Sequence, residues 1–290
     1  MDFQLTSDQR DLQQGVRALL AGRFDRTALR ALADAPEGPV LDRELWRELG
    51  AAGFFALRLP ESEGGVGLGL PEAVLAFEEA GRALLPGPLV ATHLAAGEVE
   101  GAATGATVVT AVDPGGLVPW LDASDVVRGD TARAVPVRSV DPLTPLHRTP
   151  TAPESPDPVA VLLTAAEQLG SAARSCETAV RYAGERAQFG QPIGAFQAVK
   201  HLCAQMLVRT ELARAAVYAA AVTADPAEIT GAALLADEAA VLGARDCLQV
   251  HGGMGFTWES DVHLHLKRAW LRAELGPSAG GVEEAWAAAL

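Results

Sequence analysis

The chain has 290 residues, of which 49% are hydrophobic and 21% are charged, so it is long enough for one large domain or two to three small ones. Its formal net charge of −14 argues against nucleic acid and an anionic membrane surface as partners. The sequence has neither a basic, apolar leader nor an apolar run of the ~20 residues that a membrane span needs, so we expect a cytoplasmic protein.

The first segment predicts helices separated by glycine-rich and proline-rich turns. Residues 6–24 begin with a capping box formed by Thr6 and Gln9 and continue with apolar residues at helical spacing. A second helix is expected over 41–51. Pro60 and four glycines then force a loop over 53–69, and a third helix follows over 71–84.

The middle segment has a different pattern. Short β-prone runs separated by Gly, Asp and Pro predict three to five small strands, with the clearest at 107–112, 117–121 and 132–140. Residues 141–158 contain six prolines and are expected to form a connector with little structure of its own.

Long helical patterns return near residue 159. The apolar stripe expected for the first of these helices includes Val180, and that of the second includes Leu207. The prediction is a mainly α protein with an N-terminal helical domain (1–95), a reduced β middle region with its Pro-rich connector (96–157) and a C-terminal antiparallel four-helix bundle (158–290). The helices of this last segment are expected over 159–186, 195–222, 226–250 and 258–274, with a further short one over 281–289.

The stretch RYAGERAQFGQPIGAFQAVKH (181–201) joins two of these helices through a turn. Arg186 stands at the bend, where a guanidinium can bind a pyrophosphate through two hydrogen bonds. Gln188 and Gln197 add neutral donors, and Phe189 offers a flat apolar surface. The simpler interpretation is a helical hairpin with a surface arginine.

The stretch CLQVHGGMGFTWESD (247–261) places Gln249 in the last turn of a helix before Gly252 and Gly253. Backbone without a side chain lets a ligand approach closely. The simpler interpretation is a glycine that ends a helix.

Taken together, residues 181–201 and 247–256 resemble the C-terminal helical domain of the acyl-CoA dehydrogenases, and GFFALRLPESEGGVGLG (53–69) with FEEAGRALLPGP (77–88) resembles their first domain. The resemblance covers roughly 1–95 and 155–275. It implies FAD as cofactor, with the ADP half bound by motifs of a neighbouring subunit. The residues that it assigns to these flavin contacts are Arg186, Gln188, Phe189, Gln197, Gln249, Gly252 and Gly253.

The sequence departs from the family in its middle domain and its catalytic base. The family has a full β-barrel that covers the flavin ring, whereas residues 96–157 leave room only for a reduced version. The Glu that removes the α-proton falls at Gly276 in one family arrangement and at Ala160 in the other, and neither is a carboxylate. The catalytic residues are therefore unknown.

Three nearby acids could serve if the register is shifted: Asp157, Glu167 and Glu274. We expect Glu167 to lie on a core or interface face, where it needs a partner. No metal site is expected, and His263 and His265 are assigned to the surface or an interface.

The resemblance implies a subunit that completes the flavin site of a longer acyl-CoA dehydrogenase chain, in an α₂β₂ tetramer. The longer chain would supply the base and the β-domain, act on an acyl-CoA and pass electrons to an electron-transfer flavoprotein. The ending TWESDVHLHLKRA (257–269) is similar to the steroid side-chain branch of the family. Two alternatives stay open: a flavin-free scaffold on the same fold and a self-sufficient homo-oligomeric dehydrogenase.

Overall fold

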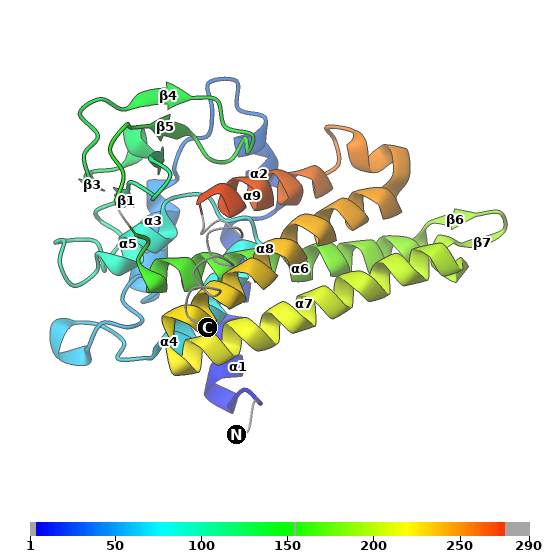
Figure 1. The fold of residues 1–290 in the computed structure, drawn as a ribbon, viewed down its shortest axis with the longest axis horizontal. Coiled ribbons are helices and arrows are strands. Elements are labelled where there is room, and N and C mark those ends of the chain that lie inside the picture. Colours follow the sequence, from blue (N-terminus) through cyan, green and yellow to red (C-terminus); the bar gives the residue numbers. More distant parts are fainter. Residues whose placement is uncertain (1–3, 154, 276–290) are drawn as a thin grey trace, which may run out of the picture.

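The computed structural model describes residues 4–153 and 155–275, and most of this part is helical (Figure 1). The N-terminal helices follow the sequence signals. Thr6 and Gln9 form the expected capping box, and Gly53 adopts a φ of +80° where the chain turns after the third helix. The helices are α1 (Ser7–Arg23), α2 (Arg26–Ala33), α3 (Arg43–Ala51), α4 (Leu70–Arg82) and α5 (Leu89–Leu94), with a 3-10 turn η1 (Glu61–Glu63).

The sequence reasoning missed two of these helices, α2 and α5. They contain eight and six residues, which is fewer than the window over which helical periodicity is recognisable. A short helix of this kind is stabilised by packing more than by its own sequence pattern.

The middle segment forms two small sheets. Strand β1 (Val109–Ala111) pairs in parallel with β3 (Val126–Arg128), and the antiparallel sheet has the order β2 (Leu117–Pro119), β5 (Leu146–Arg148), β4 (Val135–Val137). The prediction that 141–158 has little structure of its own was wrong in one respect, since β5 is the central strand of this sheet. Four residues lie between Pro145 and Pro150, and three of them suffice for a strand of this length.

The C-terminal segment is the expected helical bundle. Asp157 and Asp225 cap two of its helices, and each is followed by proline at the first helical position. The predicted helix over 281–289 lies outside the described residues. The elements are α6 (Pro158–Glu185), β6 (Ala187–Gln188), β7 (Gln191–Pro192), η3 (Ile193–Ala195), α7 (Gln197–Thr223), α8 (Pro226–His251), η4 (Gly252–Phe256) and α9 (Val262–Leu275).

Helices α4 and α6 touch backbone to backbone through two glycines. A Cβ added to Gly81 would lie 1.9 Å from the carbonyl oxygen of Glu167, and one added to Gly170 would lie 1.8 Å from that of Glu78. This contact fixes α6 against the N-terminal helices and so determines where Glu167 lies.

Two adjacent buried acids of α4 also tie the N-terminal helices to the rest. Glu79 accepts two hydrogen bonds from Arg17 of α1 (2.8 and 2.6 Å). Glu78 pairs with Arg214 of α7 and accepts a hydrogen bond from the Tyr218 hydroxyl (2.7 Å). A single large hydrophobic core runs through α1, α3, α4 and the bundle. The domain boundaries at 95/96 and 157/158 stay predictions.

Helix α7 leaves an apolar face uncovered by the described residues. Leu207 is 53% exposed, and Val208, Leu212 and Val222 are more exposed still. The prediction that Leu207 and Val180 belong to core stripes was therefore wrong, because both side chains point away from the bundle axis and are more than half exposed. No helix within the described ranges has the length and apolar character to cross a membrane.

Candidate functional site

The connection between α6 and α7 is a tight β-hairpin that extends beyond the helices (Figure 1). Its two central residues, Phe189 and Gly190, have φ values of +54° and +79°, as a two-residue type I′ turn requires. This conformation is unfavourable for a phenylalanine, and the Phe189 side chain is 92% exposed. Backbone strain combined with an exposed aromatic ring points to a contact with another molecule.

The α8–α9 connection supplies the second motif. Gly252 ends α8 with a φ of +60°, so its conformation accounts for the glycine. Gly253 is different, since it is exposed, has no positive φ, and a Cβ added to it would meet nothing within 4 Å. The described fold therefore gives no reason for glycine at 253, whereas close approach of a ligand to the backbone would.

The structure places both motifs at the same end of the bundle. The rings of Tyr182, near the end of α6, and His251, at the end of α8, stack with centroids 4.1 Å apart. A small separate core of residues from α6, α7, α8 and α9 lies beneath both motifs. We call this region, residues 186–197 and 249–253, the open end.

The polar side chains of the open end are exposed and largely uncommitted. Arg186 follows the last residue of α6, and its guanidinium has no hydrogen bond or ion pair within residues 4–153 and 155–275. Gln188 donates only to the neighbouring carbonyl of Ala187 (2.8 Å). Gln197 and Gln249 are exposed. A charged fork, amide donors, an aromatic face and bare backbone together suit a dinucleotide.

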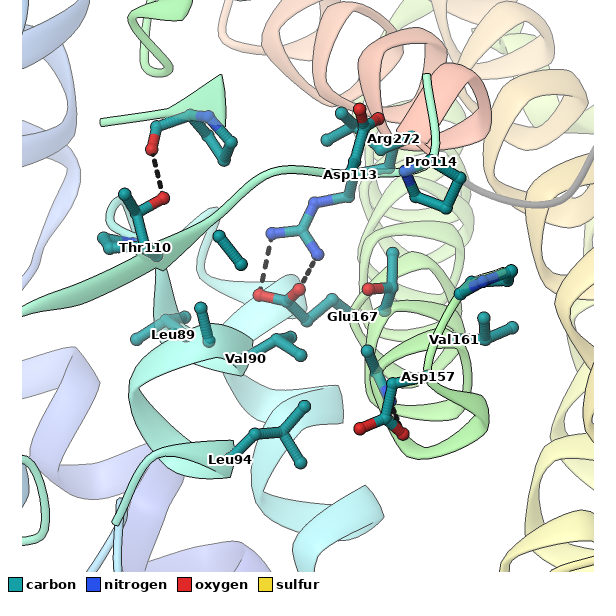
Figure 2. A pocket seen from close by; sticks show the side chains of 18 of the residues that line it. Leu89, Val90, Leu94, Thr110, Asp113, Pro114, Asp157, Val161, Glu167 and Arg272 are labelled. Atoms are coloured by element: carbon teal, nitrogen blue, oxygen red, sulfur yellow. Dashed lines mark hydrogen bonds and ion pairs between the residues drawn. The ribbon is translucent and has the colours of Figure 1, made fainter. Parts of the chain in front are cut away.

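A cavity of about 370 Å³ lies near the opposite end of α6, between α5, α6, α9 and the β1 region (Figure 2). Its walls are mainly apolar, with Leu89, Val90 and Leu94 of α5 facing Val161 of α6. One family position for the base belongs here, since Ala160 lines the cavity. Leu275, the last residue that the structure describes, lines it as well. Gly276 itself lies outside the described residues.

The acids considered as substitutes for the base have other partners or positions. Asp157 caps α6 by accepting from the backbone N–H of Val159 (2.8 Å). Glu167 forms a buried two-pronged ion pair with Arg272 of α9, one contact being 2.7 Å, as Figure 2 shows. The expectation that Glu167 needs a partner is confirmed. Glu274 is exposed and does not line the cavity.

Sequence reasoning missed two ionisable side chains that line this cavity. Asp237 of α8 accepts a hydrogen bond from Gln168 (2.7 Å), and burial raises its pKa to about 6. Arg268 of α9 pairs with Asp141 and donates to the carbonyl of Leu85, but its Nη2 has no partner among the described residues. The signal for Asp237 was present, because it lies within a run of buried alanines on α8.

The histidines of α9 were expected at the surface or an interface, but His263 is buried and His265 is half-buried within the chain. His263 is 9% exposed and stacks on Trp258, with centroids 4.8 Å apart. His265 lies 2.8 Å from the Ser171 hydroxyl, and burial lowers its pKa to about 3. The start of α9 is covered by α2 and α6, so its residues face inward on more than one side. Within the described ranges, no group of three or more His, Cys, Asp or Glu could hold a metal ion.

Two helical segments joined by a small β-region, with an open end and an interior cavity at opposite ends of α6, define an acyl-CoA dehydrogenase fold. The C-terminal domain model of the acyl-CoA dehydrogenases matches residues 160–288, and their N-terminal domain model matches residues 6–105. The chain belongs to this family.

Its relatives include the acyl-CoA dehydrogenase IpdE2 of Mycobacterium tuberculosis, which is 38% identical over 91% of this chain and 91% of its own length. Among solved structures, a steroid acyl-CoA dehydrogenase, the Tcur3481–Tcur3483 G363A variant, is 25% identical with a TM-score of 0.83, covering 98% of this chain and 99% of that one. The ChsE4–ChsE5 complex of Mycobacterium tuberculosis has a TM-score of 0.84 at 24% identity, covering 99% and 98%, and it supports the fold.

Proposed function

We propose that this chain is the cofactor-completing subunit of a heteromeric, FAD-dependent acyl-CoA dehydrogenase. Its open end would hold the ADP half of an FAD whose flavin ring lies in a longer partner subunit. The partner would supply the catalytic Glu, the β-domain and most of the acyl-CoA pocket, in an α₂β₂ tetramer that passes electrons to an electron-transfer flavoprotein.

The length of α6 carries this proposal. Ala160, in the cavity, and Arg186, at the open end, stand 26 residues apart along one continuous helix, which corresponds to about 40 Å. An extended flavin dinucleotide is much shorter than this. An FAD held by Arg186 could therefore not place its ring at the cavity of the same chain, and its ring would have to lie in another protomer.

The residues of the open end have distinct parts in this arrangement. Arg186 would donate two parallel hydrogen bonds to the pyrophosphate, where its exposed guanidinium is uncommitted. Gln197 and Gln249 would orient the adenosine by hydrogen bonds, and Phe189 would cover its apolar face. Bare backbone at Gly253 would let the dinucleotide lie against η4.

The interior cavity supports the division of labour between subunits. FAD, when bound, would supply the acceptor for the β-hydride of the acyl-CoA, and a carboxylate would have to remove the α-proton. At Ala160 there is no carboxylate, and Glu167 could act only by giving up its ion pair with Arg272. Asp157 would have to release the N-terminus of α6. The base would therefore come from the partner.

The apolar face of α7 offers a surface for such a partner. Val208, Leu212 and Val222 lie along one side of a 27-residue helix and are 56–65% exposed. An exposed apolar stripe of this length typically marks a protein interface.

The names of two similar solved structures, ChsE4–ChsE5 and Tcur3481–Tcur3483, describe assemblies of two chains, and one is a steroid enzyme. A bulky steroid-derived acyl-CoA is the substrate class that we propose.

Two other functions remain as alternatives. A flavin-free scaffold would use the bundle only for assembly, but the strained and exposed Phe189 and the unexplained glycine at 253 favour a ligand at the open end. A self-sufficient homo-oligomer would need a base in this chain. Asp237 is the carboxylate that such an enzyme could use, because its raised pKa suits proton transfer near neutral pH.

The test is co-expression with a longer acyl-CoA dehydrogenase chain encoded beside it. We expect the two chains to co-purify with FAD and to oxidise an acyl-CoA. Arg186→Gln should lower the FAD content of the assembled complex, whereas Arg133→Gln, at an exposed site in the middle segment, should leave it unchanged. Stoichiometric FAD and acyl-CoA oxidation by the lone chain would refute the proposal. An unchanged FAD content in Arg186→Gln would favour the scaffold.

A further inference from the structure

A second cavity, of about 430 Å³, lies between α1, α4, the middle of α6 and the start of α9. It is separate from the cavity of Figure 2, which is lined by the first turns of α6 and by α5. The walls of the second cavity are rich in arginine, although the chain as a whole carries a net charge of −14. The arginines are Arg17, Arg26, Arg82, Arg174 and Arg181.

Two of these arginines are neutralised by acids of the same cavity. Arg17 donates twice to Glu79 (2.8 and 2.6 Å), and Arg26 donates twice to Asp261 (2.5 and 3.2 Å). The remaining acid of the wall, Asp25, accepts from the backbone N–H of Ala28 and caps α2. The acids of the cavity are thus already used.

The other three arginines of the wall outnumber the acidic side chains that pair with them. Arg82 and Arg174 share one acid at the rim, Glu177, whose carboxylate pairs with Arg82 and lies 3.9 Å from Arg174. Arg181 has no ion pair or hydrogen bond within the described part of the chain. The three guanidinium groups therefore have only one carboxylate partner between them, the half-exposed Glu177.

The crowding of like charges acts on the pKa of Arg174. Burial lowers the pKa of Arg174, and the nearby charges of Arg82 and Arg181 lower it further. An anion placed among these three side chains would replace repulsion with attraction. Arg174 and Arg181 stand seven residues apart on α6, so they project from the same face of the helix.

A buried hydroxyl provides the second, independent observation. Ser175 lines this cavity, is 1% exposed, and its Oγ has no hydrogen-bond partner among the described residues. A buried donor without a partner is unfavourable, so a ligand oxygen that accepts a hydrogen bond from Ser175 at this point would be favoured. Thr178 adds a second hydroxyl one turn along α6.

We propose that this cavity binds a phosphate group, held by the guanidinium groups of Arg82, Arg174 and Arg181 and by the hydroxyl of Ser175. The cavity is larger than one phosphate ion, and Leu20 and Phe24 form part of its wall. The ligand is therefore a phosphate ester with an organic substituent, of the size of a nucleotide. This site does not rest on the proposed function, since it uses neither the partner subunit nor the open end.

Calorimetric titration of the purified full chain with ADP and with inorganic phosphate, at low ionic strength, tests the proposal. ADP is expected to bind, and Arg174→Gln should weaken it about tenfold or more. Ser175→Ala should weaken it by a smaller factor. Arg133→Gln should bind ADP as the unchanged chain does. The loss caused by Arg174→Gln should be the same when it is made in an Arg186→Gln background, which separates this site from the open end.

Binding of inorganic phosphate as tight as that of ADP would support the phosphate site and identify the free ion as its ligand. The absence of binding for both probes would overturn the proposal. So would equal ADP binding with and without Arg174→Gln, in the unchanged chain and in the Arg186→Gln background, because the nucleotide would then lie outside this cavity. Thermal unfolding of each variant checks that it is folded. If Arg174→Gln does not fold, Ser175→Ala, the smallest change, still tests the site.

Discussion

The two ends of α6 differ in how many of their side chains find a partner within the same chain. Near its start, Glu167 is buried and paired with Arg272, and Gly170 touches the backbone of α4. Beyond its end, Arg186 has no partner within the described residues, and Phe189 is 92% exposed in a strained conformation. The contacts within the chain explain the residue types at Glu167 and Gly170. They do not explain the residue types at Arg186 and Phe189.

This difference shows where to look for function in a single chain of an assembly. A residue whose type is required by its own fold gives little information about ligands. A residue that is strained, exposed or sterically unconstrained, as Phe189 and Gly253 are, requires a reason outside the chain. The predictions below test whether the two ends differ as described.

The largest effect is expected for the buried ion pair. Glu167→Gln should lower the free energy of unfolding by about 3–5 kcal/mol, because it leaves the Arg272 charge buried without its partner. Urea denaturation measures this. The double change Glu167→Leu with Arg272→Leu should be less damaging than Glu167→Gln alone. The matched control is the exposed pair Arg23–Glu48, where Glu48→Gln should cost less than about 1 kcal/mol.

The glycine contact between helices should come next. Gly170→Ala should destabilise the chain by about 2–3 kcal/mol, because its Cβ would meet the backbone of Glu78, which cannot move aside as a flexible side chain does. Gly184→Ala, on the same helix with nothing within 4 Å, should stabilise by about 0.5–1 kcal/mol. Similar stabilities for the two variants would show that α4 and α6 are not in backbone contact.

The open end should show the reverse behaviour. Gly253→Ala should change the stability of the lone chain by less than about 0.5 kcal/mol, since the space around it is empty. In the assembled complex it should weaken FAD retention about tenfold, which corresponds to about 1.4 kcal/mol. Gly15→Ala, another unconstrained glycine, should leave FAD retention unchanged. Loss of stability in the lone Gly253→Ala chain would mean that the fold itself requires this glycine.

The smallest effect is a pH dependence of stability at Asp237, which lines the interior cavity. Burial raises the pKa of Asp237 from 3.8 to about 6, so the folded state holds this proton more tightly than the unfolded state. Its contribution to stability is therefore fully present below pH 4 and is lost as the pH rises through about 6. Asp237→Asn should remove this dependence, and the difference in unfolding free energy between the two chains should change by about 1 kcal/mol between pH 5 and 7. If the difference in unfolding free energy does not change with pH, the side chain of Asp237 is exposed to water rather than buried.

Much of the fold followed from local sequence signals. The capping box at Thr6 and the Asp-Pro starts at 157 and 225 mark three helices within a residue or two, because each satisfies backbone donors by itself. The strand β5 and the short helices α2 and α5 escaped notice. Their three to eight residues are fewer than the window over which periodicity is recognisable, and they are held by neighbours far away in the sequence.

The candidate site divides in the same way. The motifs around Arg186 and Gly252–Gly253 were recognisable because a turn with glycine at fixed positions is a local feature. Arg268 and the arginines of the second cavity were not recognisable, because their meaning depends on which side chains face them. The one sequence signal for Asp237 was its place within a run of alanines. Burial and pairing are properties of contacts across the chain.

The sequence by itself determined the helical architecture, the family, the short β-region and the absence of a carboxylate at Ala160 and Gly276. Only the tertiary structure decided that Glu167 is held by Arg272, that the open end and the interior cavity stand about 40 Å apart on α6, and that one cavity gathers five arginines. Periodicity and capping act between residues that are close along the chain. Charge pairing, cavities and distances between sites arise from residues brought together by packing, which one-dimensional patterns do not encode.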